Sequence, residues 1–380
     1  MMKAFFTSIF LLAGILVFSQ NTDSTKNQEL SLLFLGDIMG HGPQITSAYD
    51  AESKSYNYDD VFKYVKDIIS EPDYAIGNLE VTLAGPPFKG YPQFSSPDAL
   101  AKACQNAGLD VLVTANNHSC DRGGDGIKRT IQVLDSLNII HTGTFQDQAE
   151  RDKNYPLIIE NDCMRIALLN YTYGTNGLPF PAPTIVNMID KEQMKKDLEV
   201  AKSKNVDKII VFTHWGSEYQ LLPNEYQKSN GKFLFENGAD IIIGAHPHVL
   251  EPMVWEKQEA EEGKESLIVY SLGNFVSNQR KRYTDGGSMF KMTFKKEGNK
   301  TFLKDAGYIL TWVYTPTEDN KKKYYVLPAA QYENNAEFFD NSESYEKMKA
   351  FIKDSRELFG TENVAVPEYK YVDGKWQIQP

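Results

Sequence analysis

The sequence predicts an α/β fold in which largely parallel strands are covered by helices. Short apolar runs alternate with amphipathic stretches from Leu30 onward. Several of these runs end in glycine or another small residue and are followed at once by a polar side chain. The 380 residues are 41% hydrophobic, which supplies a sizeable core for one large domain or two ordinary ones.

The first half of the chain contains three of the expected strands. Each apolar run leads into a polar motif, the first at Asp37, the second at Glu80 and the third at His118. Stretches with helical spacing of apolar residues lie between them, and Ser96 followed by Pro97 is expected to begin one of these helices. We expect strands at residues 32–35, 74–76 and 111–113, and helices at residues 61–69, 97–107 and 126–137.

The second half repeats the alternation after two paired strands. His214 and His246 follow two of its apolar runs. The charged segment 256–265 is expected to be a solvated hairpin loop. The expected elements are strands at residues 157–160, 164–171, 208–212, 241–243 and 266–270, and helices at residues 190–204 and 226–237.

The pattern changes after about residue 295. Residues 302–313 and 324–327 have the pattern of antiparallel strands joined by a polar turn, and residues 342–359 that of one amphipathic helix. We assign residues 30–294 to the main domain and residues 295–380 to a C-terminal extension of strands and helix packed on it.

The N-terminus has the pattern of an export signal. Lys3 gives a short positive start, residues 4–18 are mostly apolar, and a polar exit follows at Ser19. The apolar run is shorter than the ~20 residues of a spanning helix. We expect a signal peptide at residues 1–20, a flexible leader at residues 21–29 and a periplasmic or cell-envelope location. The alternative is an uncleaved segment that tethers the protein to the membrane.

The overall charge limits the class of partner. The formal net charge is −11, which argues against broad attraction to nucleic acid and predicts no nucleic-acid partner. An anionic small-molecule or polymer substrate would need a local cation to offset this field, and a bound metal ion would supply one.

Cys104, Cys120 and Cys163 include no pair with metal-binding spacing. Cys120 follows His118 closely, which suggests a nucleophile, but no base lies near it in sequence. We favour a buried structural thiol there.

The polar residues at the strand ends predict a metal site. In open α/β sheets, ligands bind just beyond the carboxyl ends of the strands, so these separate segments should point toward one edge of the sheet. Carboxylate, imidazole and amide groups together suit one or two divalent ions such as Mn, Zn, Fe or Mg. His246 and His248 lie two residues apart, so an extended backbone would aim both imidazoles the same way. The candidate site residues are Asp37, Glu80, Asn117, His118, His214, His246 and His248.

Six ordered motifs resemble the CapA/PgsA family of poly-γ-glutamate capsule synthesis proteins, which is itself similar to calcineurin-like metallophosphoesterases. The resemblance covers residues 32–276 and not the segment after residue 295. The motifs are Gly36-Asp37-Ile38-Met39, Gly77-Asn78-Leu79-Glu80, Ala115-Asn116-Asn117-His118, His214-Trp215-Gly216-Ser217-Glu218-Tyr219, Gly244-Ala245-His246-Pro247-His248 and Ser271-Leu272-Gly273-Asn274-Phe275.

The resemblance implies a four-layer α/β/β/α sandwich of the metallo-dependent phosphatase type, with one or two metals at the strand ends. By the same resemblance, Asp37 and His248 would hold the first metal and Glu80 would bridge both. The second metal would be held by Asn117, His214 and His246. His118 resembles the family's non-ligand histidine, which protonates the leaving oxygen or stabilises negative charge beside the substrate.

One motif departs from the calcineurin-like pattern. Those enzymes have Asp-x-His where this chain has Asp37-Ile38-Met39. Methionine is a poor ligand for hard ions, so the first metal site is short of a ligand, which puts a two-metal mechanism in doubt while a single-metal site fits.

Further residues of the motifs are candidates for substrate binding. For Asn274, a role in a tight turn is an equal alternative to substrate binding. For Glu218 and Tyr219, the alternatives are a solvent-exposed carboxylate and a packed ring. Asn116 is alternatively expected to support neighbouring site residues without touching the substrate. Asn78 completes this set. His41 and His141 lack such context and are expected to be structural or surface residues, and Asp121 is expected to form an ion pair or a helix cap.

Three functions fit these residues. The first is a metal-dependent phosphoesterase-type hydrolase acting on an envelope polymer linkage, and retention of His118 favours it. The second is a capsule assembly factor without turnover, which the family name favours and which would work with membrane-bound capsule-synthesis partners. The third is a metal-dependent amidase acting on γ-glutamyl bonds.

Overall fold

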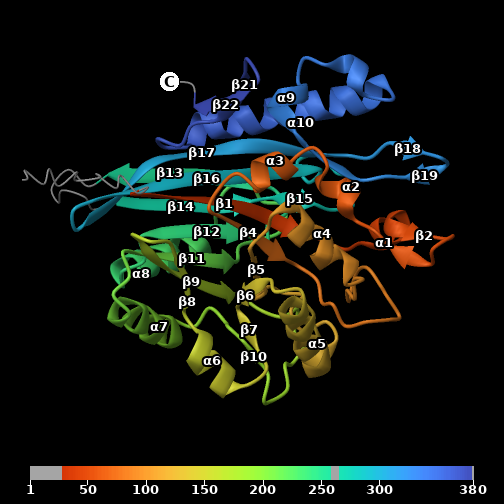
Figure 1. Cartoon of the computed structure of the whole chain (residues 1–380). Coiled ribbons are helices and arrows are strands. Elements are labelled where there is room, and N and C mark those ends of the chain that lie inside the picture. The colour runs from red at the N-terminus through yellow and green to blue at the C-terminus, as the bar shows by residue number, and fades with distance from the viewer. Residues whose placement is uncertain (1–27, 258–264, 379–380) are drawn as a thin grey trace, which may run out of the picture.

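Two mixed β-sheets form the centre of the molecule. The computed structural model describes residues 28–257 and 265–378. The first sheet has the order β20-β17-β16-β1-β4-β5-β6, with β15 also paired to β1 (Figure 1). β1, β4, β5 and β6 are mutually parallel, whereas β16, β17 and β20 run antiparallel. The strands are β1 (Glu29–Ile38), β4 (Tyr74–Leu79), β5 (Val111–Val113), β6 (Ile140–Thr142), β15 (Asn274–Val276), β16 (Gly286–Glu297), β17 (Lys300–Tyr314) and β20 (Tyr325–Pro328).

The second sheet has the order β13-β14-β12-β11-β9-β8. Its four inner strands are parallel, and the two outer strands run antiparallel to their neighbours. The parallel strands therefore end at one edge in each sheet. The strands are β8 (Leu157–Glu160), β9 (Arg165–Thr172), β11 (Lys208–His214), β12 (Ile241–Ala245), β13 (Leu250–Lys257) and β14 (Glu265–Leu272).

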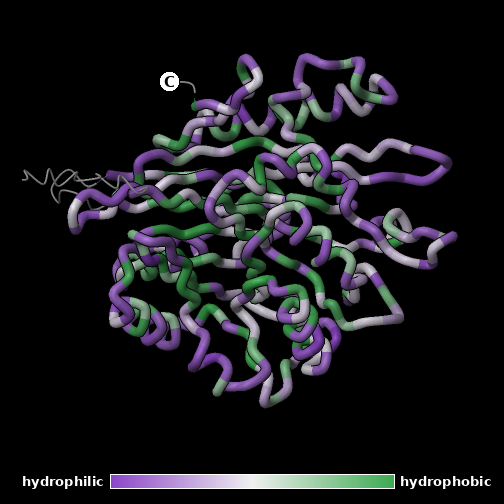
Figure 2. The backbone as a smooth tube through the Cα atoms, viewed as in Figure 1, coloured by the Kyte–Doolittle hydropathy of each residue, from purple (hydrophilic) through white to green (hydrophobic). Residues whose placement is uncertain are grey.

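Alternate residues of each inner strand face opposite layers. In β1, Leu32 and Phe34 pack between the two sheets, whereas Leu33 and Leu35 pack against helices on the outer face. β11 shows the same division, and its Ile210 lies between the sheets. Because both faces are covered, these strands are continuous apolar runs rather than alternating ones. Figure 2 shows hydrophobic backbone concentrated in the interior strands.

Helices cover the outer face of each sheet, so the four-layer α/β/β/α fold is confirmed. α4 (Ala99–Ala107) and α5 (Gly123–Ser136) bury apolar residues against the first sheet. α7 (Lys191–Ser203) and α8 (Glu225–Glu236) do so against the second, where Figure 1 shows them on the far side from β17.

The expected domain boundary at residue 295 falls inside β16. β16 pairs with β1 and β17 along most of its length, so the first sheet continues through the C-terminal segment. α10 (Ser342–Glu362) packs against β13 and β17, and a hairpin of β21 (Tyr369–Val372) and β22 (Lys375–Ile378) follows. These residues therefore complete the central sheet as well as extend it.

Several local expectations were wrong. Glu29 is not part of a leader, because it pairs with Lys295 as the first residue of β1. The helix expected from Pro97 begins at Ala99 without a side-chain cap, because the backbone N–H of Ser96 donates to Thr82 and holds that residue outside the helix. The helix expected at residues 61–69 is two short ones, α2 (Asp59–Phe62) and α3 (Lys66–Ile69), and strand β13 was not expected.

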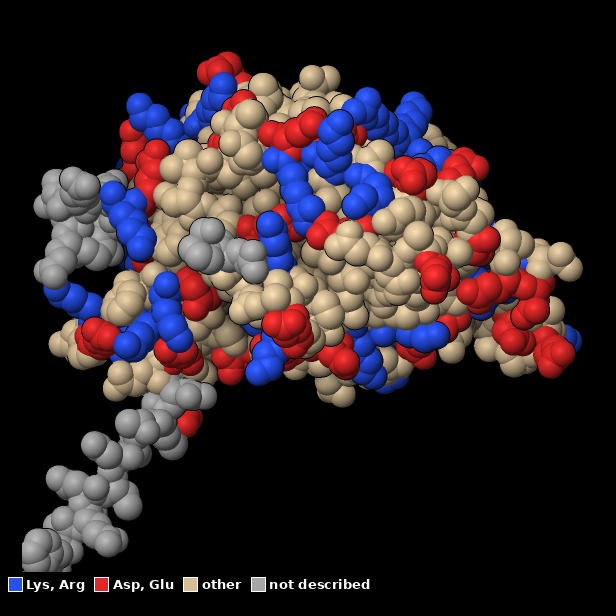
Figure 3. All heavy atoms as spheres, turned by 90° about the horizontal axis from the view of Figure 1, so that it is seen from above, with Lys and Arg blue, Asp and Glu red and all other residues tan. Residues whose placement is uncertain are grey.

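The predicted signal peptide, most of the predicted leader and residues 258–264 lie outside the described residues. Within the described ranges, no helix has the length and apolar character needed to cross a membrane. On the face seen from above in Figure 3, Lys and Arg side chains are interspersed with Asp and Glu.

Candidate metal centre

The strand ends of the two sheets bring six of the predicted residues together. Asp37 lies near the end of β1 and Glu80 directly follows β4, both in the first sheet. His214 ends β11, and His246 and His248 follow β12 in the second sheet. The site thus lies between the carboxyl ends of two sheets, whereas the sequence pattern alone suggested the edge of one. The sixth residue is Asn117, after β5.

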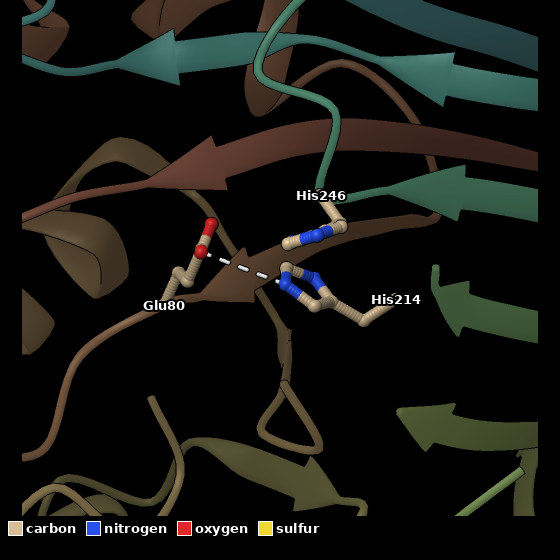
Figure 4. Close-up of side chains that lie close together, drawn as sticks. All are labelled: Glu80, His214 and His246. Carbon is tan, nitrogen blue, oxygen red and sulfur yellow. Dashed lines mark ion pairs between the residues drawn. The ribbon is translucent and has the colours of Figure 1, made fainter. Parts of the chain in front are cut away.

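Two groups of three potential ligands share Glu80. One contains Glu80, His214 and His246, and the other contains Asp37, Glu80 and His248; within each group the ligand atoms lie within 4.8 Å of one another. Figure 4 shows Glu80, His214 and His246 converging from separate elements on one space. His214 Nε2 lies 3.5 Å from Glu80 Oε1 and 2.8 Å from Asn117 Oδ1.

Glu80 itself shows that the site fits a cation. Its side chain is fully buried, and neither carboxylate oxygen has a hydrogen-bond donor in the described part of the chain. Burial and then the neighbouring Asp37 carboxylate hold the pKa of Glu80 well above its usual range. A buried carboxylate without donors beside a second one is unfavourable, and a divalent ion between them removes that cost.

His214 and His246 are suited to bind a metal as neutral imidazoles. Burial, followed by the neighbouring histidines, holds the pKa of both well below the usual value. Nδ1 of His246 is buried without a hydrogen-bond partner among the described residues. A neutral ring with an unused nitrogen is the form that coordinates a divalent ion.

His248 is in a different state. Burial lowers its pKa, but the hydrogen bond and charge of Asp37 outweigh burial, so the pKa is raised overall. Nδ1 lies 3.3 Å from Asp37 Oδ2 and 3.0 Å from Asn274 Oδ1. Asn274 is fully buried, and its amide nitrogen donates to the backbone oxygens of Thr284 and His248. Asn274 therefore orients His248.

The backbone around the two histidines is strained. His246 has φ +103° and His248 has φ +57°, values that non-glycine residues rarely adopt. Such strain persists where the surrounding structure fixes it, and it concentrates at functional sites. Asp37 is positioned by a close approach of β15 to β1, since a Cβ at Gly36 would overlap the backbone oxygen of Gly273.

His118 lies beside the two groups and is held by Asp121. Its Nδ1 lies 2.8 Å from Asp121 Oδ2, which also accepts the backbone N–H of Phe94. The Phe94 ring packs edge-on against the imidazole at 4.6 Å between centroids. Asp121 was expected to form an ion pair or a helix cap, and the structure shows its carboxylate bound to His118.

Asn78 and Asn116 lie behind the ligands. Asn78 Nδ2 is 2.8 Å from Asp37 Oδ1 and 3.2 Å from His214 Nδ1, and Asn116 donates to Asn78 and to the backbone of Leu79. Both asparagines are fully buried. For Asn116 this is the supporting role given above as its alternative, and for Asn78 the expected substrate contact is replaced by a positioning role, because both amides are used within the protein.

Glu218 and Tyr219 lie at the rim. Both are exposed, and the Tyr219 ring centroid is 6.2 Å from that of His248. The charge of Glu218 contributes to raising the pKa of both Glu80 and His248. His41, which was expected to be a structural or surface residue, also lies near the site: its ring packs against Phe94 and its Nδ1 accepts the N–H of Asn278 at 3.4 Å.

Sequence reasoning missed Phe94 and Tyr173. Tyr173 packs against His246 with ring centroids 4.5 Å apart. Neither aromatic belongs to a polar motif, so the sequence holds no signal that separates them from core residues. Only the folded structure shows that they lie beside the site. His141 lies 3.1 Å from Asp135 on α5 and does not join the two groups.

Met39 and Cys120 do not act as ligands. Met39 is buried in the apolar layer between the first sheet and its helices. Cys120 is buried with its thiol near the backbone oxygen of Leu178, and burial raises its pKa. Both observations fit the structural roles that their chemistry suggests.

A family model covers the segment that holds this candidate centre. Residues 31–279 match the model described as bacterial capsule synthesis protein PGA_cap, which is more than half of the chain and includes every candidate ligand named above. The chain belongs to this family. Its PGA_cap segment contains β1 to β15, and β16 to β22 lie beyond it.

Two capsule proteins are similar to this chain over about 72% of its length. The capsule biosynthesis protein CapA of Bacillus anthracis is 31% identical over 296 residues, which cover 72% of this chain and 66% of that protein. The PGA biosynthesis protein CapA of Bacillus subtilis is 32% identical over 287 residues, 72% of this chain and 70% of that protein. Among solved structures, a calcineurin-like phosphoesterase YfkN from Bacillus subtilis is 13% identical with a TM-score of 0.45 and covers 87% of this chain and 98% of that one.

Proposed function

We propose that this PGA_cap protein is a metal-dependent hydrolase of the phosphoesterase type that acts on an anionic linkage of a capsule or envelope polymer. The observation that carries the proposal is Glu80, a fully buried carboxylate without donors in the described chain, shared by two groups of potential ligands. His118, whose charge acts on His214 and His246, supports turnover, since a site that only bound a structural metal would not need a further imidazole held by a carboxylate.

The ligand chemistry supports at least one divalent ion. Glu80, His214 and His246 would hold it, with the Asn117 oxygen beside them. Such an ion supplies the Lewis acidity that polarises a phosphoryl or carbonyl oxygen and activates water. Asp37 and His248 would complete a second position around the same Glu80.

His118 would handle the leaving group. Asp121 binds its Nδ1, which fixes the ring and leaves Nε2 to donate a proton to the leaving oxygen. The Asp121 carboxylate stabilises the protonated imidazole before that transfer. The edge of Phe94 limits rotation of the ring, so the proton is offered in one direction.

Export is part of the proposal. It is supported by the N-terminal pattern of Lys3 and the apolar run 4–18. Cell fractionation with antibody detection tests it: protein found in the periplasm or envelope with residues 1–20 removed supports export, and full-length protein in the cytosol contradicts it.

Two measurements test the hydrolase. The purified protein should contain a divalent metal by mass spectrometry and should hydrolyse bis-p-nitrophenyl phosphate when Mn is added. His118→Ala should lower the rate by about 10²- to 10⁴-fold on a diester with a poor alkoxide leaving group, with a smaller loss on bis-p-nitrophenyl phosphate, whose nitrophenolate leaves without a proton. The metal content should stay unchanged, because His118 acts on protons and not on the ion.

The assembly role is the alternative outcome, favoured by the names of the two CapA relatives. Retained metal with no hydrolysis of diesters across Mn, Zn, Fe and Mg would support it. Release of glutamate from a γ-linked oligomer, without diester hydrolysis, would instead support the amidase.

A further inference from the structure

A groove near the candidate metal centre contains an arginine that has no hydrogen-bond partner among the described residues. It has a volume of about 500 Å³ and lies between the segment that follows Glu80 and the N-terminal half of α5. The comparisons and the site described above assign it no role. Its lining includes Gly85, Ser95, Arg122, Lys128 and Arg129.

Arg122 is the distinctive member of this lining. Its Nε and Nη2 are buried and have no hydrogen-bond partner in the described ranges. Arg129, by contrast, is committed to Asp98 through two hydrogen bonds of 2.7 and 2.9 Å. Asp125, the one acid among the described lining residues, is exposed. Arg122 and the half-buried Lys128 therefore provide cationic groups that no described carboxylate neutralises by contact.

The chemistry of Arg122 indicates its ligand class. A buried guanidinium without acceptors is unfavourable, and its planar fork matches the two oxygens of a carboxylate or phosphate. Gly126 leaves room for this side chain, because a Cβ at Gly126 would lie 2.5 Å from the Cβ of Arg122. In a chain of net charge −11, an unpaired arginine in a groove is suited to an anion supplied from outside.

The groove is connected to the metal centre through both of its walls. One wall begins four residues after Glu80, at Ala84, and the other four residues after His118, at Arg122. A span of four residues reaches at most ~14 Å. Asp121 joins the walls, since it binds His118 and the Phe94 backbone, and Ser95 next to Phe94 lines the groove.

We propose that this groove is an oxyanion subsite that binds a carboxylate or phosphate group of an anionic oligomer. The oligomer's reacting bond would lie at the metal centre while another of its anionic groups is held in the groove. This link to the metal centre rests on the proposed function, whereas oxyanion binding by Arg122 and Lys128 does not.

Calorimetric titration of the full-length protein, stripped of metal, tests the subsite. The probes are a γ-linked glutamate pentamer and, separately, inorganic phosphate. The test variant is R122Q/K128Q, and the matched control is R165Q/K195Q, which removes the same charges from exposed positions on β9 and α7. K128Q alone provides a second variant, because Lys128 is only half-buried, and circular dichroism checks that each variant is folded.

The subsite requires that wild type binds a probe and that R122Q/K128Q weakens this binding about tenfold or more, with the control within about twofold of wild type. K128Q should lose part of the affinity. Weakened binding of the pentamer assigns a carboxylate ligand, and weakened binding of phosphate assigns a phosphate ligand. Equal losses in test and control, unchanged affinity in R122Q/K128Q, or no binding of either probe by wild type would overturn the proposal.

Hydrolysis of bis-p-nitrophenyl phosphate separates this result from the proposed function. R122Q/K128Q should keep the wild-type kcat on this small diester, because it carries no second anionic group to reach the groove. If wild type does not hydrolyse the diester but binds the pentamer, and R122Q/K128Q loses that binding, the hydrolase is contradicted and the subsite is supported. If wild type hydrolyses the diester and R122Q/K128Q binds both probes as wild type does, the hydrolase is supported and the subsite is contradicted.

Discussion

The two ligand groups around Glu80 are built from the same residue types but are in different states. Glu80, His214 and His246 form one group, in which burial lowers the pKa of both histidines well below the usual value. Asp37, Glu80 and His248 form the other, in which the Asp37 carboxylate outweighs burial and raises the pKa of His248.

This difference shows that the neighbours of a candidate ligand decide whether it is free to bind a metal ion. The first group offers neutral imidazoles, one of which has an unpartnered buried Nδ1 among the described residues. The second group already satisfies His248 through Asp37 and Asn274, so a metal there has to displace a proton and weaken these contacts. We therefore expect the first group to bind metal more tightly, and the second, which lacks a ligand at Met39, more weakly.

Glu80→Gln should have the largest effect, because Glu80 belongs to both groups. We expect metal affinity to fall by more than about 100-fold at both positions, since the loss of a direct ligand exceeds the effect of losing a supporting residue. Metal titration followed by mass spectrometry measures this. As a control, thermal unfolding of the stripped protein should show no loss of stability, because the change removes a buried carboxylate; a variant that still binds one ion tightly would contradict the shared role.

His246→Ala and His248→Ala should separate the groups. His246→Ala is expected to lose the tightly held ion, whereas His248→Ala should retain it and lose only the weaker one. Metal-to-protein ratios after dialysis report the outcome, with wild type as the reference. Equal loss in the two variants would show that the groups bind with similar strength.

The pH dependence of stability should have opposite signs in the two groups. For metal-stripped protein, His246 has a folded pKa below its usual value of 6.5, so it stabilises the fold above pH 6.5 and loses this contribution as the pH falls. His248 has a raised pKa, so its contribution is present below pH 6.5 and is lost as the pH rises through the folded value.

Chemical denaturation between about pH 5 and pH 8 tests these signs. Relative to wild type, His246→Ala should lose less stability on acidification, and His248→Ala should lose more. If the free energy of unfolding changed with pH in the same way in both variants, the opposite roles expected for His246 and His248 would be contradicted.

Asn274→Ala should have the smallest effect and should be confined to the second group. Removing the Oδ1 that contacts His248 is expected to weaken metal binding there by about tenfold, the lower end for a residue that orients a ligand. Binding to the first group should be unchanged, and competition with a metal-sensitive dye measures both. Weakening of both ions would show that Asn274 maintains the whole site rather than His248 alone.

The sequence predicted the ligands better than their surroundings. Asp37, Glu80 and the three histidines were predicted because polar residues directly after apolar strands are conspicuous. An ion pair was expected for Asp121, but not its partner His118 three residues earlier in the chain. The proximity of His41 and Phe94 to the site was not predicted, since these contacts join segments far apart in the chain. Asn78 was assigned to substrate, and Asn116 to substrate or to support of its neighbours, because the sequence does not indicate which way an amide points.

The sequence by itself determined the α/β alternation, the order of the strands along the chain and the polar residue at each strand end, because these follow from local periodicity and residue type. Only the tertiary structure decided that the strand ends belong to two sheets, that Glu80 lies between them without a donor in the described chain, and that Asp37 reaches His248 but not His214. These features depend on how two sheets pack through side chains distant in sequence, and burial and charge then set the pKa of each ligand.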